Sequence, residues 1–265
     1  MTKDRSVRVV IPARYGSSRF PGKPLVELNG KPMIQHVYER AVACRAVSNV
    51  LVATDDERIK QAVERFGGHV VLVTGDYRTG TDRVAAVARM FAGDYFLNLQ
   101  GDEIPLNPEL LTDLIEPFLT SGVAMGTLKR VMDPTENLLN PAVVKVVTDA
   151  QGEALYFSRA PIPFVRDDPE QQVRGGLHYI HLGLYMYTKE TLLRLAALPT
   201  SRLEDAEKLE QLRALDHGIR LRVWDTQHAS LRVDRPEDVP DVAERLQEYD
   251  AIKRELESRG VVSKR

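Results

Sequence analysis

The sequence predicts an α/β fold, in which a mainly parallel sheet carries helices on both faces and a smaller antiparallel lobe is attached. Short, mainly apolar runs at residues 7–11, 49–54, 70–73 and 95–100 alternate with segments of helical period. This alternation is typical of right-handed βαβ units, which form a parallel sheet between two helix layers. After residue 121 the pattern changes to short alternating runs separated by turns, which is typical of antiparallel strands.

Length and composition indicate one large domain without a nucleic-acid or membrane partner. The chain has 265 residues, of which 43% are hydrophobic, so a single domain over residues 1–265 can bury a sizeable core. The net charge is -2 with both signs interspersed, so no basic field for gripping nucleic acid is expected. The N-terminal stretch is too polar for a secretory segment, and no apolar run approaches the roughly 18 residues of a spanning helix. We therefore expect a soluble, cytoplasmic protein.

The first predicted strand, residues 7–11, ends in a loop that suits a polyphosphate. This loop, residues 11–24, contains two glycines, several hydroxyl and guanidinium side chains, and Lys23 between two prolines. Glycine lets main-chain N–H groups approach an anion closely, while arginine and lysine supply charge for phosphate oxygens. The spacing excludes a P-loop and a dinucleotide-binding glycine motif. On composition alone, a solvated basic loop is the alternative.

The next segments continue the alternation and carry polar groups at their ends. The strand at residues 49–54 is followed by three acids, which suit a helix cap better than a metal site. Thr79 and Asp82 likewise form a candidate capping box for the next helix. The strand at residues 95–100 differs, because Asp102 leaves its carboxyl end toward the same crevice as the basic loop. A carboxylate there is well placed to hold a hard cation on phosphate oxygens.

The antiparallel lobe is expected at residues 121–165. Its runs at residues 124–130, 143–148 and 154–157 are short, and turn residues separate them. Arg159 follows beside a segment stiffened by two prolines, an arrangement that suits bidentate recognition of a carboxylate. A surface salt bridge is an equally good interpretation of this arginine.

A strand at residues 178–187 and an amphipathic helix at residues 203–215 come after the lobe. His181 and Tyr185 share one face of that strand, while His178 points to the opposite face, which argues against a zinc site. Leucine and alanine side chains form the core stripe of the predicted helix, and glutamates lie beside that stripe. Solvated acids on a helix face are the ordinary interpretation of those glutamates.

Several strings resemble the cytidylyltransferases that activate acidic sugars as CMP conjugates, most closely the 3-deoxy-manno-octulosonate cytidylyltransferase family. They occur in the family's order, from residue 9 to about residue 239. The strings are Pro12-Ala-Arg14, Ser18-Arg19-Phe-Pro-Gly-Lys23, Thr79-Gly-Thr81-Asp-Arg83, Gln100-Gly-Asp102, His181-Leu-Gly-Leu-Tyr185, Leu209-Glu-Gln-Leu-Arg213 and Val233-Asp234. No single string would suffice for the assignment.

The resemblance implies a Rossmann-like, three-layer nucleotidyltransferase fold. It also implies a reaction in which CTP and 3-deoxy-manno-octulosonate (Kdo) give CMP-Kdo and pyrophosphate, for lipopolysaccharide or capsule synthesis. By the same resemblance, Asp102 and Asp234 hold Mg²⁺, and together with Lys23 they are the catalytic residues. The lobe at residues 121–165 is implied to form a homodimer. Without the resemblance, Asp234 is equally well interpreted as the cap of the last helix.

The resemblance further implies which residues bind each substrate. The implied nucleotide-binding residues are Pro12, Ala13, Arg14, Arg19, Lys23, Thr81 and Arg83. The implied sugar-binding residues are Gln100, Arg159, His181, Tyr185, Glu210 and Gln211. The chain departs from the family at Arg235, where threonine is usual, and at Tyr77-Arg78. The first departure puts the charge balance beside Asp234 in question.

Two other functions fit the same strings. One is CMP activation of a different acidic acceptor, such as an 8-amino Kdo analogue, a nonulosonic acid or a hydroxy acid. The other, from a different class, is a catalytically silent nucleotide-binding scaffold. Retention of Lys23, Asp102 and Asp234 argues against the scaffold.

Overall fold

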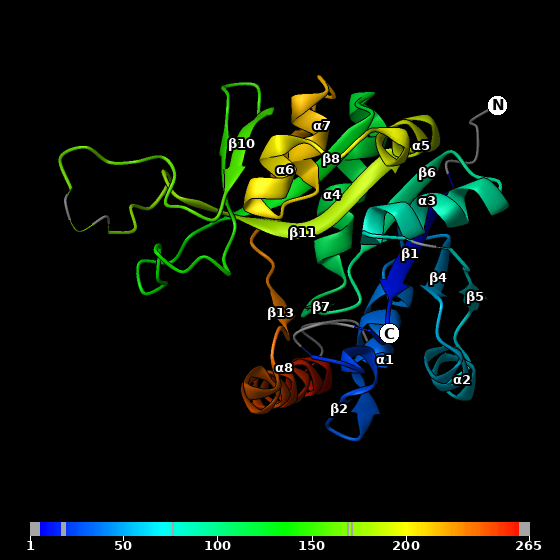
Figure 1. Ribbon diagram of the computed structural model, residues 1–265. Coiled ribbons are helices and arrows are strands. Elements are labelled where there is room, and N and C mark those ends of the chain that lie inside the picture. The colour runs from blue at the N-terminus through cyan, green and yellow to red at the C-terminus, as the bar shows by residue number, and fades with distance from the viewer. Residues whose placement is uncertain (1–5, 17–19, 76, 169, 171, 260–265) are drawn as a thin grey trace.

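A mixed sheet runs through the whole molecule (Figure 1). The computed structural model describes residues 6–16, 20–75, 77–168, 170 and 172–259. Within them the sheet has nine strands in the order β10-β9-β11-β6-β1-β4-β5, and β8 and β12 join it beside β11. No helix in this described part of the chain is both long and apolar enough to cross a membrane.

The parallel half of the sheet is confirmed. It consists of β1 (Val7–Ala13), β4 (Asn49–Thr54), β5 (Val70–Leu72) and β6 (Tyr95–Leu99). β1 is central, pairing in parallel with β4 on one side and β6 on the other. The carboxyl ends of β1 and β6 therefore meet at one edge of the sheet, where ligands bind in open α/β sheets.

The antiparallel half begins where the sequence predicts the change of pattern. β11 (Tyr179–Thr188) runs antiparallel to β6 and to β8 (Met125–Val131), while β9 (Lys145–Thr148) pairs with β10 (Ala154–Ser158) and touches β11 at Ile180. β12 (Arg222–Asp225) joins β8 in parallel. These strands extend the main sheet, and the segments between them reach away from the body at the left of Figure 1.

Two hydrophobic cores lie on opposite faces of the sheet, as the alternation of β1 requires. Val9 and Ile11 belong to one core with residues of α1, α2, α4 and α8, whereas Val10 belongs to the other with residues of α3, α5 and α7. The helix bounds are α1 Met33–Val42, α2 Glu57–Arg65, α3 Gly80–Met90, α4 Glu109–Ser121, α5 Lys189–Ala197 and α8 Val239–Ser258. The three-layer prediction is confirmed.

The single helix predicted at residues 203–215 is wrong. The chain forms two short helices instead, α6 (Arg202–Glu207) and α7 (Gln211–Asp216), and Lys208 between them has a left-handed φ of 54°. Of the predicted core stripe, Leu209 and Leu212 are buried, whereas Leu203 and Ala206 are exposed. The amphipathic period missed that the acids beside the stripe bind main-chain and hydroxyl donors of other elements, which requires the turn.

Short elements complete the fold. They are η1 Lys23–Leu25, β2 Glu27–Leu28, β3 Lys31–Pro32, β7 Glu103–Pro105, β13 Ser230–Arg232 and η2 Pro236–Asp238. β7 and β13 form an antiparallel ribbon in which Arg232 faces Glu103 across the pair. This ribbon brings the residues just before β7 close to those just after β13.

Candidate active site

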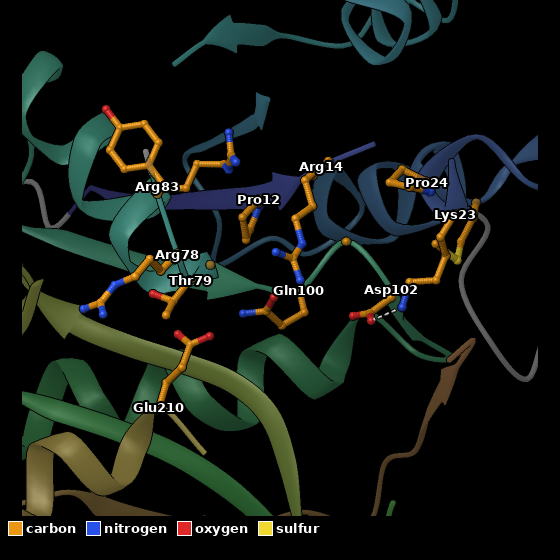
Figure 2. A pocket seen from close by; sticks show the side chains of 15 residues that line it. Pro12, Arg14, Lys23, Pro24, Arg78, Thr79, Arg83, Gln100, Asp102 and Glu210 are labelled. Atoms are coloured by element: carbon orange, nitrogen blue, oxygen red, sulfur yellow. Dashed lines mark hydrogen bonds and ion pairs between the residues drawn. The ribbon is translucent and has the colours of Figure 1, made fainter. Parts of the chain in front are cut away.

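A crevice opens at the carboxyl ends of β1 and β6 (Figure 2). β1, η1, the N-terminus of α3 and the turn after β6 provide most of its walls. The lining residues are Pro12, Ala13, Arg14, Lys23, Pro24, Met33, Tyr77, Arg78, Thr79, Gly80, Arg83, Gln100, Gly101, Asp102 and Glu210. Figure 2 shows Arg14 and Gln100 near its middle, with Lys23 and Asp102 at one end and Glu210 below Thr79.

The crevice gathers eight of the residues that were predicted to act. They are Pro12, Ala13, Arg14, Lys23, Arg83, Gln100, Asp102 and Glu210. A small adjoining cavity, bordered by Glu210 as well, is lined by three further predicted residues, Thr81, Tyr185 and Gln211. His181 packs against Tyr185 behind it, with ring centroids 5.3 Å apart. Arg19 lies outside the described residues.

Lys23, Asp102 and Asp234 meet at one end of the crevice. The Lys23 ammonium donates hydrogen bonds to Asp102 Oδ2 and, at 2.9 Å, to the carbonyl of Val233, and it lies 3.9 Å from Asp234 Oδ1. The β7–β13 ribbon explains this meeting, because Asp102 directly precedes β7 and Asp234 closely follows β13. Two carboxylates that are distant in the sequence are thereby held around one buried amine.

The charges around Asp102 favour its ionised form. Burial by itself would raise the pKa of this carboxyl, but the positive charges of Arg232 and Lys23 outweigh burial, and the pKa lies below its usual value. Arg232 also lies 3.3 Å, from Nη2 to Oδ1, from Asp234. Arg232 therefore lies beside the same pair of carboxylates as Lys23.

The two aspartates suit a hard divalent cation. Carboxylate oxygens are the donors that Mg²⁺ prefers, and Mg²⁺ is commonly held by one or two carboxylates together with substrate phosphates. The described residues contain no group of three or more His, Cys, Asp or Glu side chains arranged to hold a metal. Asp102 and Asp234 would thus supply the protein's part of a coordination shell that substrate oxygens complete.

The N-terminus of α3 forms the wall opposite Lys23. The predicted capping box is confirmed, since the Thr79 hydroxyl accepts from the Asp82 N–H and the Asp82 carboxylate accepts from the Thr79 N–H. Arg83 is buried and donates to Asp55 Oδ2 at 2.9 Å. Asp55 was interpreted only as part of a cap, and its pairing with Arg83 could not be read from the local sequence.

Glu210 joins the crevice to the adjoining cavity. Its carboxylate accepts hydrogen bonds from the Thr81 hydroxyl at 2.7 Å and from the Thr81 N–H at 3.3 Å. Burial raises the pKa of Glu210, and the Thr81 hydrogen bonds oppose that rise. The structure places Glu210 against the nucleotide-side residue Thr81, and its contact with a sugar stays a prediction.

Arg213 ties the two capping boxes of the site together. It is 3% exposed at the side chain, donates to both Glu204 carboxylate oxygens at 2.8 and 2.5 Å, and lies 3.7 Å from Asp82. Glu204 belongs to the capping box of α6, and Asp82 to that of α3. The hydrogen bond to Glu204 raises the pKa of Arg213 further. One arginine thus fixes α6 and α7 against the start of α3.

Replacement of Arg213 by methionine is expected to lower the free energy of unfolding by about 3 kcal/mol, because Glu204 would be left buried without its counter-ion. Lys208→Met is the matched control, since the ion pair of Lys208 with Asp205 is exposed and its loss should leave the free energy of unfolding nearly unchanged. Urea denaturation measures both. Equal stabilities of the two variants would contradict the bridging role.

His181 contributes a neutral imidazole. Burial, with a smaller effect from Arg232, lowers the pKa of His181 to about 3, so the ring is uncharged near neutral pH. The Thr127 hydroxyl is 2.7 Å from the Leu184 carbonyl, to which it donates, and 3.1 Å from His181 Nε2. Nε2 therefore carries the proton and Nδ1 is an acceptor. The uncharged ring can accept a hydrogen bond from a hydroxyl, but it has no positive charge with which to neutralise a carboxylate.

Arg159 does not line the crevice. Its Nε donates to the Glu207 carbonyl at 2.7 Å and its Nη1 to the Pro141 carbonyl at 2.8 Å. The Glu207 carboxylate in turn accepts from Ser158 and from the Arg159 N–H. The guanidinium is therefore engaged with main-chain acceptors of the protein. Its predicted role in recognising a sugar carboxylate gains no support from this geometry.

Sequence reasoning missed Arg232 and attributed the extra positive charge beside Asp234 to the wrong arginine. Arg235 had raised that question, but its side chain is 65% exposed and lies 3.5 Å from Glu237. Arg232 is the arginine that faces the aspartates. A signal was present, because residues two apart in an extended segment point the same way, and Arg232 stands two before Asp234.

Known proteins are similar to this chain over most of its length. A family model described as "Cytidylyltransferase" matches residues 8–221. A 3-deoxy-manno-octulosonate cytidylyltransferase of Trichlorobacter lovleyi is 49% identical over 246 residues, which are 90% of this chain and 98% of that protein. An 8-amino-3,8-dideoxy-manno-octulosonate cytidylyltransferase of Shewanella sp. (strain ANA-3) is 48% identical over 91% of this chain and 98% of its own. A solved structure of CMP:2-keto-3-deoxy-manno-octonic acid synthetase complexed with CTP matches with a TM-score of 0.83 and 40% identity, covering 92% of this chain and 99% of that one.

Proposed function

The chain belongs to the cytidylyltransferase family, and on that premise we propose that it couples CTP to Kdo, giving CMP-Kdo and pyrophosphate. The convergence of Asp102 and Asp234 on Lys23 carries the proposal. Nucleotidyl transfer needs positioning and charge stabilisation more than covalent chemistry from the protein. The crevice offers cationic walls for a triphosphate and an oxygen-rich end for an acceptor hydroxyl.

The residues of the crevice have distinct tasks in this reaction. Arg14 and Lys23 neutralise the triphosphate and the departing pyrophosphate. The N-terminus of α3, held by Thr79 and Asp82, forms the wall against the nucleotide, and Gln100 stands between the two substrates. Before substrates bind, the Lys23 ammonium lies beside Asp102 and Asp234, and its positive charge reduces the repulsion between their carboxylates.

Mg²⁺ is proposed to bind Asp102 and Asp234. When bound there, it would lower the pKa of the sugar's anomeric hydroxyl and neutralise charge at the α-phosphate. The aspartates orient the site for an in-line attack of that hydroxyl, and Lys23 shares their negative charge. The observation that supports this assignment is the pair of carboxylates held around one amine.

The deciding experiment is an assay of the purified protein with CTP, Kdo and Mg²⁺. Release of pyrophosphate together with formation of CMP-Kdo is expected. Failure to release pyrophosphate with any sugar acid would leave a nucleotide-binding scaffold. We place the reaction in the cytoplasm, where CTP is made, and assign it to lipopolysaccharide or capsule synthesis.

An 8-amino Kdo analogue is the second candidate acceptor. The 48% identity to a Shewanella enzyme named for that sugar favours it. The amino group replaces a hydroxyl at the far end of the sugar, so the aspartates would serve both acceptors alike. Parallel kcat/KM measurements with the two sugars separate the candidates.

We also propose a homodimer formed through the antiparallel half of the sheet and the segments between its strands, residues 125–188. Large apolar side chains are exposed there, which favours burial against a second copy. They are Val131 at 49%, Leu139 at 59%, Leu155 at 60%, Phe164 at 70% and Leu177 at 41% exposure. Phe164→Glu should therefore shift the protein from dimer toward monomer in sedimentation velocity. Ile252→Glu, at a 58% exposed site on α8, is the control that should leave the mass unchanged. A wild-type monomer at micromolar concentration would contradict the dimer.

A further inference from the structure

Arg232 lies in β13, two residues before Asp234 and opposite Glu103 across the β7–β13 ribbon. Its Nη2 is 3.3 Å from Asp234 Oδ1, and its side chain is 46% exposed. We propose that Arg232 binds the carboxylate of the acidic sugar and thereby selects acids as acceptors. This proposal rests on the proposed function.

The chemistry of the acceptor requires a cation in this position. In a 2-ulosonic acid such as Kdo, the anomeric carbon carries both the attacking hydroxyl and the carboxylate. If the hydroxyl sits beside Asp102 and Asp234, the carboxylate must lie next to them too. An anion so close to two carboxylates needs a local positive partner.

The guanidinium of Arg232 has N–H donors that can bind a substrate carboxylate. A guanidinium has five N–H donors in a planar fork that matches a carboxylate. The contact to Asp234 is a single one, and half of the side chain faces solvent. Across the ribbon, Glu103 is bound elsewhere, since its Oε1 accepts from the Ser230 hydroxyl at 2.7 Å and from the Gly183 N–H at 3.3 Å.

The other cations near the site have different engagements, including Arg78, which lines the crevice and donates to the Thr200 hydroxyl at 2.9 Å. Lys23 is buried between the aspartates, Arg83 pairs with Asp55, and Arg159 binds main-chain carbonyls. Arg213 is buried against Glu204. Arg14 lines the crevice at the end of β1, on the triphosphate side. Among the residues that the structure describes, Arg232 is therefore the best-placed partner for the acid.

The test compares Arg232→Gln and Arg232→Lys with the wild type, and Arg235→Gln serves as the matched control. Steady-state constants are measured for Kdo and for CTP, and the Kd of Kdo is measured by calorimetry. Arg232→Gln should raise KM and Kd for Kdo by on the order of a hundredfold, while KM for CTP changes less than about threefold. Arg232→Lys should recover part of the loss, since it keeps the charge without the fork. Arg235→Gln should match the wild type.

A Kdo derivative with a carboxamide in place of the carboxylate identifies the contact. Wild type and Arg232→Gln should bind this derivative with Kd values that agree within about twofold, because the lost interaction is absent from both. An unchanged Kd for Kdo in Arg232→Gln would overturn the proposal. Equal losses for CTP and Kdo would also overturn it, because Arg232 would then act through the aspartates. Inactivity of the wild type with CTP and Kdo would instead refute the proposed function. The wild type is assayed first, so the two failures are distinguishable.

Discussion

Replacement of Asp102 or Asp234 by asparagine is expected to lower kcat by at least about a hundredfold, or about 3 kcal/mol in the activation barrier. Each variant removes one anionic oxygen donor from the pair around Lys23 while keeping the size of the side chain. Hard cations bind neutral amide oxygens more weakly than carboxylates. The measurement is pyrophosphate release at saturating CTP and Kdo.

Asp225→Asn is the control for these variants, since Asp225 ends β12 and its side chain is 73% exposed. It should retain full activity. A second readout is the rise in Tm on adding Mg²⁺, which should shrink in Asp102→Asn and Asp234→Asn but not in Asp225→Asn. Full turnover by either site variant would remove the metal assignment.

Replacement of Lys23 by methionine is expected to lower kcat/KM for CTP by at least about a hundredfold. The ammonium is a charge that faces the crevice, and it also separates two carboxylates. Without it, Asp102 and Asp234 repel each other, so the Mg²⁺-free protein should have a lower Tm than the wild type. Added Mg²⁺ relieves that repulsion and should therefore raise the Tm of Lys23→Met more than that of the wild type.

Lys31→Met is the control for Lys23, because Lys31 forms an ion pair with Glu39 and is 45% exposed at the side chain. Its kcat/KM should stay within about twofold of the wild type. If Lys23→Met and the wild type respond equally to Mg²⁺, the amine does not share the carboxylates with the cation. Unchanged constants for CTP would remove the lysine from phosphate binding.

The sequence predicted those parts of the fold that follow from local pattern. The apolar runs predicted the first residue of β1, β4, β5 and β6 and placed the last residue of each within two positions. The Thr79 cap was found because its partner lies only three residues away. The position of Asp102 after a buried strand drew attention to it, whereas only the family strings drew attention to Asp234. The structure adds that both reach Lys23.

What the sequence did not reveal depends on partners distant along the chain. The turn at Lys208 arises because glutamates on either side bind Arg159 and Thr81, and no helical period contains that information. Arg232 was missed for a similar reason. Its importance comes from the pairing of β13 with β7, two strands of three residues each, which are too short to show a pattern.

The β7–β13 ribbon makes activity conditional on nearly complete synthesis of the polypeptide. A nascent chain that has emerged as far as β12 already holds the strands that form the triphosphate walls. It cannot bring a second carboxylate to Lys23 until β13 has left the ribosome and paired with β7. Truncated products ending before residue 230 lack Asp234 and should therefore be inactive in nucleotidyl transfer.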